Sequence, residues 1–179
     1  MRATSLTLGS AALAAALLLT ACGGGDSGGE GDDSGGGLKN SAACALDQVG
    51  VEVGPANAAP VAGDTGNVPV TVTNQGAECV LDGFPTVALE ADDTSATVPS
   101  DEAATAQQLT LAKDTPTTFT ITYVRGEAGG AESLDVTKVK IGLPGASETQ
   151  SFPWSYGPVA LVTGGAPNAS VGAFAQAGD

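Results

Sequence analysis

The sequence predicts an all-β fold, an antiparallel immunoglobulin-like β-sandwich. Beyond residue 40, apolar residues alternate with polar residues at a period of two, the period of a strand with one buried face. Clusters of Gly, Pro, Asn and Asp separate these alternating runs at short intervals. Short strands at regular spacing, with turn residues between them, are typical of a sandwich.

Residues 1–21 have the features of a signal peptide. Arg2 supplies a positive charge near the start, and the stretch Leu6–Leu19 is apolar and carries no charged residue. A membrane-spanning helix needs about 20 apolar residues, so this stretch is short for a permanent span and is typical of a cleaved leader. We therefore expect residues 1–21 to be absent from the mature protein.

The four residues Leu19-Thr20-Ala21-Cys22 resemble the lipobox of bacterial lipoproteins. The resemblance implies that the Cys22 sulfur is diacylated and that Cys22 becomes the first residue of the mature chain. Two or more acyl chains anchor a protein stably, whereas one gives only marginal binding. The resemblance thus implies a lipid anchor in the cell membrane, with the protein on the extracytoplasmic face. The alternatives are an uncleaved anchor, or a plain secretory signal beside an ordinary cysteine.

Residues 22–40 predict a flexible linker that follows the lipidated cysteine. The run GGGDSGGEGDDSGGG from Gly23 to Gly37 has no apolar side chain to bury and several acidic ones. Such a composition favours a disordered, self-repelling chain. The remaining residues 41–179 have the length of one ordinary domain, which we assign to the sandwich.

The strands are predicted where the alternation is regular, the clearest being Phe119, Ile121 and Tyr123 between threonines. We expect about seven to nine strands in all. They centre on residues 49–53, 68–72, 87–89, 109–111, 118–123, 139–141, 159–161 and 171–174.

Three local features modify this strand assignment. The apolar parity changes between Leu134 and Val139, which predicts a bulge near Thr137-Lys138. Proline donates no ladder hydrogen bond, so Pro69 is expected at a sheet edge. The acidic segment 91–107 is predicted to be a loop, with a short helix over residues 101–107 as the alternative.

The charge balance excludes several classes of function. The chain has 20 acidic and 6 basic residues, a net charge of −14 and no histidine. Nucleic acid binding rests on Lys and Arg contacts to phosphate, so we expect no nucleic acid partner. Catalytic triads that use histidine and His-ligated metal sites are impossible. We name no catalytic residue, no cofactor and no metal ligand.

The carboxylates leave two alternatives to a protein without catalytic residues or metal ligands. A pair of them can hydrolyse glycosides, and oxygen ligands can hold calcium. For calcium, Asp92-Asp93 and Asp101-Glu102 are expected in one loop, and Asp64 with Asn67 in another. Neither set follows the EF-hand spacing, and the acidic residues are scattered, so we expect a non-enzymatic protein.

Two cysteines remain once Cys22 is assigned to lipid. Cys44 and Cys79 form an even pair, which in an oxidising compartment favours a disulfide. The bridge would close a loop of about 36 residues and contribute about 3–4 kcal/mol. Two reduced, buried thiols are the alternative. The lone tryptophan, Trp154, is expected in the core, with an exposed platform for sugar rings as the alternative.

The segment Thr73-Asn74-Gln75-Gly76-Ala77-Glu78-Cys79-Val80-Leu81-Asp82-Gly83-Phe84-Pro85 resembles an actinobacterial family of lipoproteins and secreted proteins that carries domain of unknown function 4232. Cys44 matches the first cysteine of that family, and Leu143-Pro144-Gly145 resembles its late Pro-Gly turn. The chain departs from the family in lacking a second cysteine pair. The resemblance implies a sandwich fold and an envelope location, and it supplies no catalytic residues.

Together these features predict a lipid-anchored binding or interaction module whose partners are the membrane, through Cys22, and an envelope protein or glycan. Tethering raises the effective concentration of the domain near other membrane-bound proteins. The alternative is a solute- or ion-binding lipoprotein that serves a transporter. One sandwich lacks the two lobes with which such receptors close on a ligand.

Overall fold

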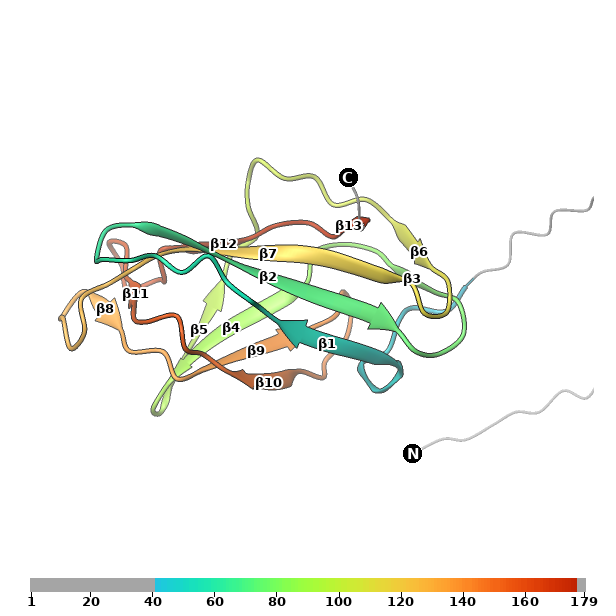
Figure 1. The fold of residues 1–179 in the computed structure, drawn as a ribbon, viewed down its shortest axis with the longest axis horizontal. Coiled ribbons are helices and arrows are strands. Elements are labelled where there is room, and N and C mark those ends of the chain that lie inside the picture. The colour runs from blue at the N-terminus through green and yellow to red at the C-terminus, as the bar shows by residue number, and fades with distance from the viewer. Residues whose placement is uncertain (1–40, 177–179) are drawn as a thin grey trace, which may run out of the picture. The chain divides into compact units, whose positions relative to one another are not determined.

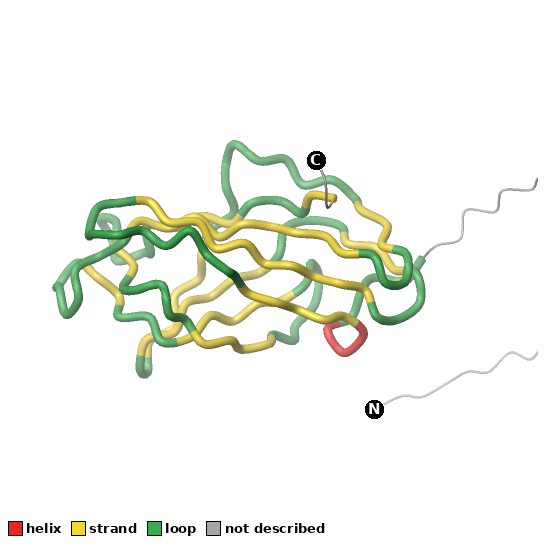
Figure 2. The backbone as a smooth tube through the Cα atoms, viewed as in Figure 1, coloured by secondary structure: helices red, strands yellow, loops and turns green. Residues whose placement is uncertain are grey.

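The computed structural model describes residues 41–176. The predicted signal peptide, residues 1–21, lipidation site, Cys22, and linker, residues 22–40, lie outside the described residues. Within the described part the chain forms thirteen short strands and one turn of 3-10 helix, η1, at Leu46–Gln48 (Figure 2). No helix in this part is long and apolar enough to cross a membrane.

Two antiparallel sheets face each other and make the predicted β-sandwich (Figure 1). One has the order β1-β2-β7-β12, with β13 also paired to β7; the other has the order β10-β9-β4-β5. The first sheet comprises β1 (Val49–Val53), β2 (Thr65–Asn74), β7 (Pro116–Val124), β12 (Ala169–Val171) and β13 (Ala175–Gln176). The second comprises β4 (Thr86–Ala91), β5 (Thr94–Val98), β9 (Lys138–Gly142) and β10 (Gln150–Pro153).

Two strand pairs extend the sandwich beyond these sheets. β3 (Cys79–Leu81) pairs with β6 (Leu109–Leu111), and β8 (Ser133–Leu134) pairs with β11 (Val159–Ala160). The strand number is higher than expected because β3, β5, β8 and β10 were not among the predicted strands, and because two short strands, β12 and β13, replace the one expected over residues 171–174.

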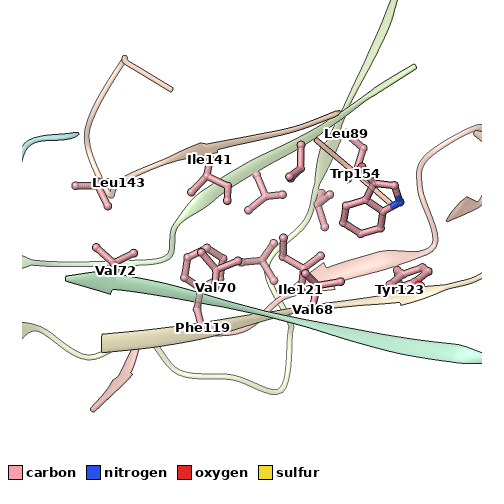
Figure 3. Close-up of a cluster of buried hydrophobic side chains, with 14 of the residues drawn as sticks. Val68, Val70, Val72, Leu89, Phe119, Ile121, Tyr123, Ile141, Leu143 and Trp154 are labelled. Atoms are coloured by element: carbon pink, nitrogen blue, oxygen red, sulfur yellow. The ribbon is translucent and has the colours of Figure 1, made fainter. Parts of the chain in front are cut away.

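The core lies between the two sheets and follows the predicted alternation. In the first sheet Val68 pairs with Ile121 and Val70 with Phe119, and all four side chains are buried. In the second sheet Leu89 pairs with Val139 in the same inward orientation. Figure 3 shows Val68, Val70, Leu89, Phe119 and Ile121 between the layers, with Trp154 beside Tyr123. Every second residue is therefore removed from water, which is the main stabilising term of such a fold.

The bulge predicted near Thr137-Lys138 is present: Glu90 of β4 is the ladder partner of Lys138, and its carbonyl also accepts from Thr137 N–H at 2.8 Å, so that two successive residues oppose one. β8 belongs to the small pair with β11, whereas β9 begins at Lys138 and pairs with β4 and β10. The parity of apolar residues changes at this bulge, which is also where the chain leaves one sheet and enters another.

The edge position predicted for Pro69 is wrong, since β2 lies between β1 and β7. Pro69 is tolerated because the ladder on its β1 side is interrupted. β1 ends at Val53, Gly54 N–H makes the last bond on that side to the carbonyl of Pro69, and the next pairing is that of Asn57 with Asn67. The missing N–H of Pro69 falls in this gap, where the sheet needs no donor.

The loop predicted for residues 91–107 contains a strand. β5 pairs with β4 after a two-residue turn at Asp92-Asp93, where Asp92 adopts a φ of 48°. Aspartate tolerates this left-handed conformation better than most residues, so the acidic pair marks a hairpin turn. The alternative of a short helix over residues 101–107 is wrong, because that part has no helix.

Candidate functional site

The predicted disulfide between Cys44 and Cys79 is present. The two Cα atoms are 4.9 Å apart, and both cysteines are buried. The bridge fixes the start of the described chain onto β3, because Cys44 N–H donates to the carbonyl of Val80 at 3.0 Å and Val80 N–H donates to Ala42 at 2.9 Å. The disulfide therefore links the start of the described chain covalently to β3.

Asn74 organises the turn between β2 and β3, inside the segment that resembles the family. Its side chain is fully buried; the amide nitrogen donates to the carbonyls of Ala77 at 2.8 Å and Leu111 at 3.0 Å. Its side-chain oxygen accepts from Gly76 N–H at 3.0 Å. The asparagine thus has a structural role, holding Cys79 in position to pair with Cys44.

Trp154 belongs to the core, as predicted. The residue is 6% exposed, and its indole N–H donates to the carbonyl of Gly157 at 2.7 Å. Its ring meets those of Tyr123 and Tyr156 edge to face, at centroid distances of 5.2 and 4.9 Å. The exposed sugar-stacking platform that was the alternative is therefore wrong for Trp154.

Tyr156 is the partly exposed member of this aromatic cluster. Burial raises the pKa of its phenol above the ordinary value, and neighbouring Tyr123 adds to the increase. Tyr156 lies where the chain leaves β10, and its hydroxyl reaches the position at which a side chain on Gly54 would begin, just after β1. The phenol therefore spans from one sheet of the sandwich to the other.

The acidic residues weighed for calcium do not lie together. β5 separates Asp92-Asp93 from Asp101, which lies beside β12 and accepts a hydrogen bond from Ala103 N–H. Asp64 accepts from Val61 N–H, and the side-chain oxygen of Asn67 accepts from Thr122. Within residues 41–176, no group of three or more His, Cys, Asp or Glu side chains is arranged to hold a metal ion.

The edge strands β1 and β10 lie on the same side of the sandwich (Figure 1). Residues on and next to these two strands line three successive hollows. The first, about 340 Å³, lies between residues 43–46 and 144–148. The second, about 440 Å³, lies between β1 and β10 at Val49 and Gln150. The third, about 620 Å³, is lined by residues 51–55 and by Phe152, Pro153, Ser155 and Tyr156. We call this row the β1–β10 groove.

The β1–β10 groove combines apolar and acidic side chains. Phe152 and Tyr156 supply aromatic surface, and Asp47, Glu52 and Glu148 supply three carboxylates. No Lys or Arg is among the residues that line the three hollows. The groove begins beside Cys44, where the chain enters the domain. A surface that combines apolar side chains with charges of one sign can bind a ligand of opposite charge.

Sequence reasoning did not find this groove. β10 was not among the predicted strands, because Gln150–Pro153 has no alternating apolar pattern, and the order of strands in a sheet has no local signal. The position of β1 opposite β10 depends both on the existence of β10 and on the order of the strands in the two sheets.

Residues 44–175 match the model of a protein family described as Domain of unknown function (DUF4232). The match spans both sheets except Gln176, both cysteines of the bridge, and the β1–β10 groove except Ala43. No curated protein matches the chain.

Proposed function

We propose, from the premise that this chain belongs to the DUF4232 family, that it is a non-enzymatic binding module held at the extracytoplasmic face of a membrane by lipid on Cys22. The sequence Leu19-Thr20-Ala21-Cys22, placed directly before an acidic glycine-rich segment, carries this proposal. The leader delivers the chain across the membrane, the acylated cysteine retains it there, and residues 22–40 give the domain reach.

The Cys44–Cys79 bridge supports the extracytoplasmic location. Disulfides persist in oxidising compartments and are rare in the reducing cytosol. Its position also suits a tethered protein. The bridge lies where the chain enters the domain, so that a pull on the tether reaches β3 through a covalent bond rather than through fraying hydrogen bonds.

A binding role is supported by the absence of histidine from the whole chain and by the pairing of Cys44 with Cys79, which leaves neither as a nucleophile. A tethered domain gains effective concentration toward partners on the same membrane, on the order of millimolar for a short flexible linker. Weak contacts through one surface then suffice. The expected partner is an envelope protein or glycan, and nucleic acid is not expected because the net charge is −14.

The test compares the native chain with Cys22→Ser in the native host. We expect the native chain to stay with washed membranes and to carry a diacylglyceryl mass on Cys22, and the variant to be released. Retention of the variant in the washed membranes would refute the lipid anchor. In-cell cross-linking should enrich one envelope component with the anchored chain and much less with Cys22→Ser; recovery of no specific component would refute the binding role.

A further inference from the structure

We infer that the β1–β10 groove binds an extended, cationic segment of a partner protein, which adds as a strand to the free edge of β1. The inference deepens the proposed function and rests on it, because it names the surface through which the tethered module would bind and the chemistry of what it binds.

The backbone of β1 has one side free. On the side that faces β2, the carbonyl of Gln48 accepts from Gln75 N–H, and Gly54 N–H donates to the carbonyl of Pro69, both at 2.8 Å. Even-numbered positions therefore face β2, which is the only strand that pairs with β1 in the described part of the chain. Because backbone groups alternate in direction along a strand, N–H and C=O groups point into the groove from Val49, Val51 and Val53.

The opposite rim is less suited to strand addition. Trp154 N–H donates to Thr137 at 2.9 Å, so even-numbered positions of β10 face β9. Ser151 and Pro153 then face the groove, and proline has no N–H to donate. A proline on a free edge blocks the addition of another strand. β1 is thus the receptive edge and β10 the opposite wall.

The side chains of β1 predict the pattern of the incoming strand. Val51 and Val53 lie on the inner face with their partners Val72 and Val70, yet they remain half-buried. Glu52 lies on the outer face and is exposed. Successive side chains of an added strand would alternate between these two environments. Apolar residues fit beside the valines and Phe152, and Lys or Arg residues fit beside Glu52.

Charge selects a partner protein over the two occupants that the chain itself offers. A second copy would bring another net charge of −14 and another Glu52 to the same edge. Residues 22–40 carry four acidic residues against Lys39 alone. Both would meet Asp47, Glu52 and Glu148 with like charge, which is unfavourable. A segment rich in Lys or Arg meets them with opposite charge.

The experiment uses the mature full-length chain in detergent micelles and three synthetic heptapeptides. One alternates Lys with Val, and one alternates Glu with Val. The third is the Lys-Val peptide with its valine nitrogens methylated, which removes the N–H groups that would donate to β1. We expect the Lys-Val peptide to bind and to slow amide exchange at Val51 and Val53. The Glu-Val and N-methylated peptides should bind at least about tenfold more weakly.

Two variants with the same change of charge test the position. Glu52→Lys should weaken binding of the Lys-Val peptide about tenfold, whereas Glu102→Lys should leave it unchanged. Glu102 is exposed in the loop next to Asp101, which hydrogen-bonds to β12 at the far edge of the same sheet. A fold check by amide exchange in the core of β7 accompanies both variants.

The inference is overturned if the Lys-Val peptide does not bind, if it protects β12 instead of β1, or if the chain dimerises with Val51 protected when no peptide is present. Any of these leaves the fractionation result for Cys22→Ser untouched, so failure of the groove is distinguishable from failure of the anchor.

Discussion

Gly66 of β2 and Tyr123 of β7 face each other across the strand pair, and the Tyr123 ring lies where a Cβ at position 66 would be. The hydroxyl of Tyr123 then reaches across the sandwich and donates a 2.7 Å hydrogen bond to the carbonyl of Tyr156. The bare backbone of Gly66 therefore provides the space in which the Tyr123 ring packs against Trp154. Because Tyr156 lines the groove, this space also shapes the groove.

Gly66→Ala should lower the free energy of unfolding by about 1–3 kcal/mol, because the new methyl group overlaps the Tyr123 ring in a packed core. Urea unfolding followed by Trp154 fluorescence measures the loss, and native emission should also shift to longer wavelength. Gly172→Ala is the matched control, since its Cβ would meet nothing closer than the carbonyl of Thr120 at 3.5 Å. Equal stability of the two variants would contradict this role of Gly66.

Asn74→Ala should cost on the order of 3 kcal/mol, because it leaves the buried carbonyls of Ala77 and Leu111 and the N–H of Gly76 without their partner. Asn67→Ala in the same strand removes an exposed side chain bonded to Thr122 and should cost less than about 0.5 kcal/mol. Urea midpoints of both variants give the comparison. A similar cost at both positions would refute the structural role assigned to Asn74.

The fold was predictable from the sequence where burial on one face imposes a period of two. The alternation of Val68, Val70 and Val72 gave the correct inward face of β2, and that of Phe119, Ile121 and Tyr123 gave that of β7. Prediction failed where pairing partners mattered. The gap in the ladder beside Pro69 and the change of sheet before Lys138 both depend on strands distant in sequence.

The site was predictable only in its covalent part. Two cysteines in a chain with a lipobox-like leader sufficed to predict the bridge between Cys44 and Cys79. The groove was not predictable, because β1 was expected from its valines but its neighbour across the opening was not. The burial pattern of β10 keeps Phe152 half-buried among exposed residues, so its sequence resembles a loop.

Removal of the bridge by the double substitution of Cys44 and Cys79 to Ala should lower stability by about 3–4 kcal/mol, since the cross-link limits the unfolded chain across a sequence separation of 35 residues. Hydrogen exchange at Val80, whose N–H bonds to Ala42, should accelerate more than exchange at Val70. Urea unfolding of the oxidised native chain and the double variant gives the first quantity. An unchanged midpoint would show that the bridge contributes nothing to stability.

Stability should fall at alkaline pH in part through Tyr156. Burial raises the pKa of its phenol in the folded state, so the folded protein holds this proton to higher pH than the unfolded chain does. The contribution is complete below the unfolded pKa of about 10 and is lost as the pH rises through the folded pKa. Tyr156→Phe keeps the ring against Trp154 but removes the titration. Urea unfolding from about pH 8 to about pH 11 should therefore show a shallower decline in the variant, while ionisations common to both chains cancel. Parallel curves would mean that the Tyr156 phenol ionises as freely in the folded protein as in the unfolded chain.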